Sequence, residues 1–95
     1  MKITVTKTAV DWFKREMDAK PGEAIRFFAR LGGCSTVQSG FSLGMAKESP
    51  RTAGISTTED GITFFMEEED VWYLNGGNLI VDYDQETDEL KFVST

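Results

Sequence analysis

The side chain best suited to chemistry in this 95-residue chain is its one cysteine, Cys34. It follows two glycines and precedes Ser35, in the stretch GGCSTVQSG. Glycine lets the backbone approach a bound group closely, and amide N–H groups beside a thiolate lower the thiol pKa. Such a thiolate would bind a metal or react with an oxidant. A lone cysteine also often serves as a small buried hydrophobe, and the residue types leave both interpretations open.

Other chemical sites are poorly supported by the residue types. The sequence has no histidine, which excludes Ser-His-Asp and Cys-His catalysis and a histidine-ligated zinc site. The acidic run at residues 82–89 could begin a calcium loop, but Thr87 and Val93 stand at its sixth and twelfth positions, where glycine and glutamate are required. The acidic residues 67–70 are better explained as the start of a short helix than as a metal cluster. We therefore predict that the protein is not an enzyme.

Composition and charge limit the partners and the location. A net charge of −6 has the wrong sign for nucleic-acid binding, and no apolar run approaches the roughly 20 residues that span a membrane. One cysteine excludes an internal disulfide and favours a reducing cytoplasm. Hydrophobic residues make up 40% of the chain, enough for one core. We expect a single cytoplasmic domain over residues 1–95, either a monomer or a homodimer.

The elements that must position Cys34 follow from the hydrophobic periodicity. A helix is predicted over residues 7–19, with Thr8 and Asp11 as a capping box. Asp60-Gly61 predicts a tight hairpin turn. Acids before an apolar stretch and Asn75-Gly76 after it favour a second, short helix, with an Asn-Gly hairpin as the alternative. Alternating side chains predict strands over residues 2–6, 23–31, 40–46, 54–58, 62–67, 78–84 and 89–93.

This pattern predicts an α+β fold dominated by sheet. Aromatic residues at alternating strand positions are expected in the core; they are Phe27, Phe41, Phe64 and Phe92. For Trp12, Trp72 and Tyr73 we expect either the core or a dimer interface.

The stretch GGCSTVQSGFSL resembles the first cysteine motif of the HesB/IscA-like family, the A-type iron–sulfur carriers. The resemblance covers nearly the whole chain, because ITVTKTAVDWFKREM is similar to the opening strand and helix of the family. The segment GITFFMEEEDVWYLNGGNLIVDY is similar to its section of strand, short helix and strand. The resemblance implies a HesB-like domain of a bacterial-type small protein. Its fold would be a compact β-sandwich or distorted barrel with an N-terminal helix and a short inserted helix.

The chain also departs from the carriers. It lacks their C-terminal Cys-x-Cys and has Thr36 and Val37 where they usually show glycine and an aromatic residue. The family's ligand set therefore carries over only to Cys34 as metal ligand, with Gly33 and Ser35 as its neighbours in a cofactor-binding loop. A cluster takes about four protein ligands, so we expect iron or a labile or shared cluster, and none tightly bound.

The resemblance thus implies an accessory protein of iron–sulfur cluster biosynthesis. It would bind iron or a labile cluster weakly through one thiolate, with assembly proteins as partners. One alternative is a HesB-like module that binds proteins without a metal. Another is a redox sensor that uses the same cysteine.

Overall fold

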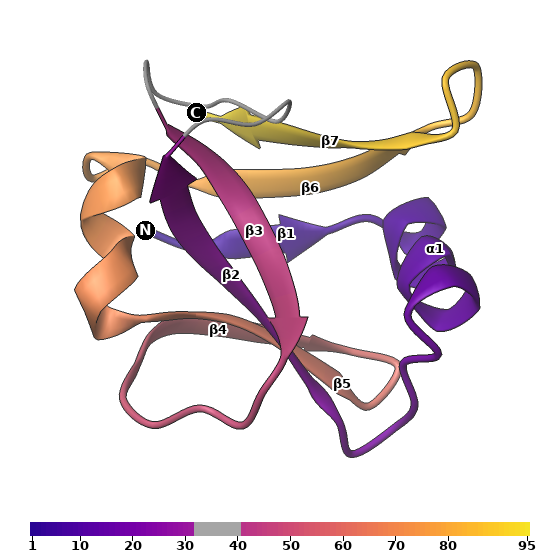
Figure 1. Cartoon of the computed structure of the whole chain (residues 1–95), viewed down its shortest axis with the longest axis horizontal. Helices are drawn as coiled ribbons and strands as arrows, with labels where there is room; N and C mark the ends of the chain where they lie inside the picture. Colours follow the sequence, from indigo (N-terminus) through magenta and orange to yellow (C-terminus); the bar gives the residue numbers. More distant parts are fainter. Residues whose placement is uncertain (32–40) are drawn as a thin grey trace.

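The computed structural model describes residues 1–31 and 41–95, with the backbone alone at residues 31, 41 and 42. These described residues form seven strands, one α-helix and one short 3₁₀-helix. Their arrangement is shown in Figure 1. In chain order they are β1 Ile3–Val5, α1 Lys7–Glu16, β2 Ala24–Leu31, β3 Phe41–Lys47, β4 Ala53–Glu59, β5 Ile62–Glu67, η1 Glu68–Leu74, β6 Leu79–Asp84 and β7 Glu89–Ser94. These elements confirm the predicted α+β fold dominated by sheet.

The strands form two sheets. One has three strands in the order β1-β6-β7, and the other has four in the order β3-β2-β5-β4. β1 pairs parallel with β6 and β2 pairs parallel with β5, whereas the remaining pairs are antiparallel. In Figure 1, β2 and β3 run across the direction of β1 and β6. Among the described helices, none is long and apolar enough to cross a membrane.

Helix α1 is capped by Thr6 and not by the predicted Thr8. Thr6 has an extended backbone, and its hydroxyl oxygen accepts a hydrogen bond from the amide of Ala9 at 3.3 Å. Thr8 lies inside the first turn, where it cannot take the extended conformation of an N-cap residue. The helix also ends at Glu16, three residues before the predicted end, because Asp18 adopts a left-handed conformation with φ of 52°.

The hairpin turn between β4 and β5 is as predicted. Asp60 and Gly61 have φ of 52° and 79°, the positive values that a primed two-residue turn requires. The side chain of Lys14 pairs with Asp60 at 2.7 Å and joins this turn to α1.

The short helix is also confirmed, and the alternative Asn-Gly hairpin is wrong. Helix η1 begins at Glu68 and ends at Leu74, and Asn75 behind it is left-handed with φ of 51°. A 3₁₀-helix has about three residues per turn, so side chains three positions apart lie on one face. Asp70 and Tyr73 therefore share the buried face, and Glu69 and Trp72 share an exposed face.

Both sheets and α1 contribute to one hydrophobic core. At its centre, Phe13 of α1 lies with its ring 5.9 Å from that of Phe27 and 5.1 Å from that of Phe64. Phe92 of β7 reaches the same group, 6.0 Å from Phe27. Three of the four phenylalanines predicted for the core are thus packed in it or against it. The side chain of the fourth, Phe41, lies outside the described part.

Candidate functional site

The predicted ligand Cys34 and its neighbours Gly33 and Ser35 lie outside the described residues, so their role stays a prediction. The strands on either side of them are described. β2 and β3 pair from Ile25 opposite Lys47 to Leu31 opposite Phe41. The two backbone ends that flank residues 32–40 therefore lie side by side at one end of the four-stranded sheet.

The described residues hold a cluster of ion pairs around η1, which we call the η1 cluster. It joins strand β2, the loop before β4, the end of β5 and the first turn of η1. Four carboxylates face two guanidinium groups in it, and together with the neighbouring Glu68 the group carries three net negative charges. Its members are Arg26, Glu48, Arg51, Glu67, Glu69 and Asp70, with Glu68 beside them.

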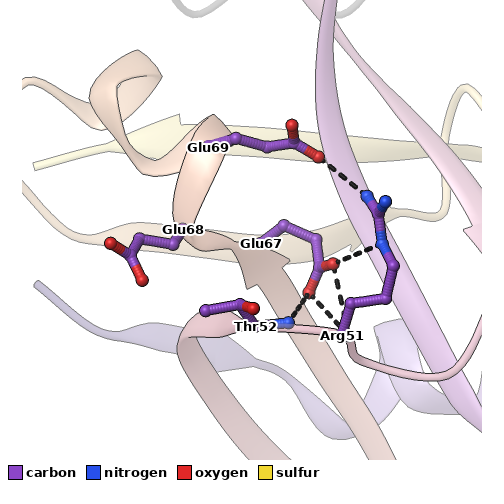
Figure 2. A pocket seen from close by; sticks show the side chains of 5 residues that line it. All are labelled: Arg51, Thr52, Glu67, Glu68 and Glu69. Carbon is purple, nitrogen blue, oxygen red and sulfur yellow. Dashed lines mark hydrogen bonds and ion pairs between the residues drawn. The ribbon is translucent and has the colours of Figure 1, made fainter.

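Glu67 is the most buried carboxylate of the cluster, with 3% of the residue exposed. It accepts hydrogen bonds from the backbone amides of Arg51 and Thr52 at 3.2–3.3 Å and from Nε of Arg51 at 3.1 Å (Figure 2). Burial alone would raise the pKa of Glu67. The hydrogen bonds from Arg51 and Thr52 outweigh that effect and hold the pKa of Glu67 below its ordinary value. Glu67 is therefore a carboxylate anion that ties the loop before β4 to the start of η1.

Arg26 makes the second set of contacts, from β2 to η1. Its Nη2 donates to Asp70 at 2.8 Å and lies 3.4 Å from Glu69, while Nη1 lies 3.4 Å from Glu48. The hydrogen bond that Arg26 donates to Asp70 raises the pKa of Arg26, and burial offsets this effect only in part. Its Nε is the one buried side-chain nitrogen or oxygen without a hydrogen-bond partner among the described residues. The guanidinium instead packs over the ring of Phe28, 5.3 Å from the ring centre.

An open hollow of about 640 Å³ lies against the η1 cluster, lined by Arg51, Thr52, Glu67, Glu68 and Glu69. In Figure 2, Glu67 and Glu69 point toward Arg51, whereas Glu68 points away from it. Arg51 Nη2 pairs with Glu69 at 2.8 Å, and the Arg51 side chain is 68% exposed. The hollow thus has a buried, fully paired carboxylate on one side and an exposed acidic side chain on the other.

The acidic stretch at residues 67–70 contains the start of η1, as predicted, and it also joins η1 to β2 and to the loop before β4. Within residues 1–31 and 41–95, no group of three or more His, Cys, Asp or Glu side chains could hold a metal ion. The second acidic stretch forms the turn between β6 and β7. There Asp82 accepts from the hydroxyl of Thr6 at 2.8 Å, and the Tyr83 hydroxyl donates to Asp88. Each stretch therefore uses some of its carboxylates in contacts within the fold.

Sequence reasoning missed the partnership of Arg51 with Glu67. The signal was present in the hairpin, because a turn at residues 60 and 61 pairs Glu59 with Ile62 and carries that register along both strands. Extending it to the end of the hairpin brings Ala53, the first residue of β4, opposite Glu67, so that Arg51 and Thr52 lie close by. A bulge between Ala53 and Ile55 shifts the register by one residue.

The aromatic residues assigned to the core or an interface divide among three environments. Tyr73 is fully buried, Trp12 is partly buried against the core, and Trp72 is 51% exposed. Trp72 packs edge-on to Tyr73 with ring centres 6.0 Å apart. Trp72 is therefore a half-exposed indole on the outer face of η1.

Sequence comparison finds close relatives over the full length. The chain is 49% identical over 92 residues to the pyruvate dehydrogenase inhibitor of Bacillus subtilis, covering 97% of each protein. It is 31% identical over 97 residues to an uncharacterized protein of Staphylococcus saprophyticus, covering 99% of each. It is 30% identical over 95 residues to an uncharacterized protein of Staphylococcus aureus, covering 97% of each.

Structure comparison finds the same fold in a crystal structure of IscA with the [2Fe-2S] cluster. The TM-score is 0.62 at 16% identity, over 95% of this chain and 79% of IscA. The model of the iron–sulphur cluster biosynthesis family matches residues 1–95. These matches confirm the resemblance to HesB/IscA-like proteins, and the chain belongs to the iron–sulphur cluster biosynthesis family.

Proposed function

We propose that this chain binds pyruvate dehydrogenase and inhibits it. The observation that carries the proposal is its 49% identity, over 97% of both proteins, to the pyruvate dehydrogenase inhibitor of Bacillus subtilis. This function belongs to the class of metal-independent interaction modules that the sequence left open. The protein acts by surface contact and needs no catalytic residue of its own.

The possible metal ligands of the chain favour an inhibitor over an independent cluster scaffold. Each chain supplies one thiol and no imidazole, whereas an iron–sulfur cluster takes about four protein ligands, mostly thiolates. Carboxylates are poorer ligands for cluster iron, and those of the η1 cluster are already paired with arginines. One chain alone therefore does not fit a tightly held cluster.

The test is a titration of purified bacterial pyruvate dehydrogenase with this protein, in metal-free buffer with a chelator. We expect activity to fall in a saturable manner, and Cys34→Ala to inhibit as strongly as the wild type. Unchanged activity at a large molar excess of the wild type would refute the proposal. Inhibition by the wild type but not by Cys34→Ala would assign it to the thiol instead.

A second function is favoured by the whole-chain family match. Here Cys34 binds iron or a labile cluster as cargo, weakly or shared with a second copy or an assembly protein. Anaerobic reconstitution with ferrous iron and sulfide tests it on wild type and Cys34→Ala in parallel. Retained iron with charge-transfer absorption only in the wild type would support this function, and equal iron in both would refute it. Oxidation of Cys34 by mild peroxide without any metal would favour the redox sensor.

A further inference from the structure

We propose that the exposed face of η1, centred on Trp72, is the surface with which this chain binds pyruvate dehydrogenase. This inference rests on the proposed function and names the contact surface for it. The partner segment that fits this face carries a lysine or arginine next to an apolar side chain. Three features of the described residues carry the inference: an exposed indole, its acidic surroundings and its rigid support.

The first feature is the exposure of Trp72. Its residue is 51% exposed, whereas Tyr73 beside it and Leu74 behind it are buried. Large exposed hydrophobic residues in the described part are otherwise Met1 and Val93. Tryptophan is enriched among the residues that dominate the free energy of protein binding, because it buries a large apolar area with little loss of side-chain entropy. A partner that covers this indole removes apolar surface from water, which stabilises the complex.

The second feature is charge. Glu69 precedes Trp72 by three residues, so the two side chains lie on one face of the 3₁₀-helix. Glu68 is exposed and points away from Arg51, and Glu68 and Glu69 both line the hollow (Figure 2). The η1 cluster with Glu68 leaves three negative charges, half of the net charge of −6. A cationic side chain entering the hollow would meet Glu68, while its apolar neighbour would cover Trp72.

The third feature is that η1 is firmly held. Arg26 ties Asp70 of η1 to β2, and Glu67 ties the residue before η1 to the backbone of Arg51 and Thr52. Tyr73 and Leu74 anchor its inner face in the core. A preorganised binding surface loses less conformational entropy on association. The contacts around η1 therefore present Trp72 in a fixed orientation, as a binding surface requires.

The experiment compares variants in the titration of purified pyruvate dehydrogenase. Trp72→Ala removes the indole, and Glu68→Lys reverses one exposed charge without touching the core. We expect each to raise the half-inhibitory concentration at least about tenfold. The matched controls, Val93→Ala on β7 and Glu86→Lys in the β6–β7 turn, should stay within about twofold of the wild type. Added salt should weaken inhibition by the wild type more than inhibition by Glu68→Lys.

The outcomes separate this inference from the function on which it rests. If the wild type does not inhibit, the proposed function fails. If it inhibits and both η1 variants inhibit equally well, the function stands and the surface is wrong. Self-association of the wild type that Trp72→Ala abolishes, with inhibition unchanged, would assign the face to a second copy of this chain. Thermal unfolding of each variant verifies that a loss of inhibition is not a loss of folding.

Discussion

Arg51 encloses the carboxylate of Glu67 from two directions, through its backbone amide and through Nε of its side chain. The amide of Thr52 completes the set at 3.3 Å. Glu67 is the last residue of β5 and the N-cap residue of η1, so this contact joins the loop before β4 to both elements. The buried carboxylate thus holds the start of η1, the helix that carries the candidate binding face, in place.

Replacing Glu67 by glutamine should destabilise the fold. The amide of glutamine has one oxygen to accept hydrogen bonds and places an NH₂ group against the donors of Arg51 and Thr52. We expect the melting temperature of Glu67→Gln to fall by about 4–8 °C. Glu68→Gln is the matched control, because Glu68 is exposed, and it should melt within about 1 °C of the wild type. Equal melting of the two variants would show that the Glu67 contacts contribute nothing to stability.

The same contact predicts a pH dependence. Burial raises the pKa of Glu67, but hydrogen bonds from Arg51 and Thr52 outweigh it, so the folded-state pKa lies below the ordinary value of 4.5. A lowered carboxyl pKa contributes stability above the unfolded-state pKa, and the contribution is lost as pH falls through the folded-state pKa. The difference in unfolding free energy between wild type and Glu67→Gln should therefore be constant near neutral pH and shrink below about pH 4.5.

Urea denaturation of both proteins over this pH range measures that difference. Asp60 and Asp82 also have lowered pKa values, through hydrogen bonds from Lys14 and Thr6, and they weaken the fold in acid. Their effect is common to both proteins and cancels in the comparison. A difference that grows as the pH falls would contradict the assigned direction of the Glu67 pKa shift.

Local chemistry made much of this fold predictable. Asp60-Gly61 and Asn75-Gly76 were recognisable because each pair can adopt positive φ, and all four residues do so. Alternation identified the strands because side chains in a sheet point to opposite faces in turn. These signals depend on a few neighbouring residues, and tertiary contacts did not override them.

The parts that escaped prediction depend on residues far apart in sequence. Alternation shows which face of a strand is buried but not which strand lies beside it, so the parallel pairs β1–β6 and β2–β5 were not foreseen. The sequence placed Glu67 at a helix start and did not show its hydrogen-bond donors, because they come from residues 51 and 52. Trp72 and Tyr73 were treated alike, although a helix with about three residues per turn places them on different faces. The candidate ligand Cys34 stays a prediction.

The N-cap that the structure gives to α1, Thr6 in place of the predicted Thr8, can be tested by substitution. The Thr6 hydroxyl accepts from the Ala9 amide and donates to Asp82 at 2.8 Å, so it joins α1 to β6. Thr6→Ala should lower the free energy of unfolding by about 1–2 kcal/mol. Thr8→Ala should change it by less than about 0.5 kcal/mol, since Thr8 lies inside the first turn. Thr6→Ser should keep most of the stability. If Thr8→Ala lowered the free energy of unfolding more than Thr6→Ala does, the N-cap would be Thr8, as the sequence predicted.

Gly54 sets how closely η1 can pack on β4, and this gives a last test of the η1 face. A Cβ atom at Gly54 would stand 2.6 Å from Cγ1 of Val71 and 3.0 Å from the backbone Cα of Glu68. Such contacts are too short, so Gly54→Ala must push η1 away from the strand. We expect a loss of about 1–3 kcal/mol in the free energy of unfolding, measured by urea denaturation.

The double variant Gly54→Ala, Val71→Ala separates the two clashes. Removing Cγ1 of Val71 relieves the shorter contact but leaves the backbone of Glu68 in place, so stability should recover only in part. If the η1 face binds pyruvate dehydrogenase, Gly54→Ala should also weaken inhibition, because the displaced helix carries Trp72 with it. If Gly54→Ala kept full stability, a movement of β4, and not of η1, would have relieved the clash. Normal inhibition by a destabilised but folded Gly54→Ala would show that the position of η1 does not matter for binding.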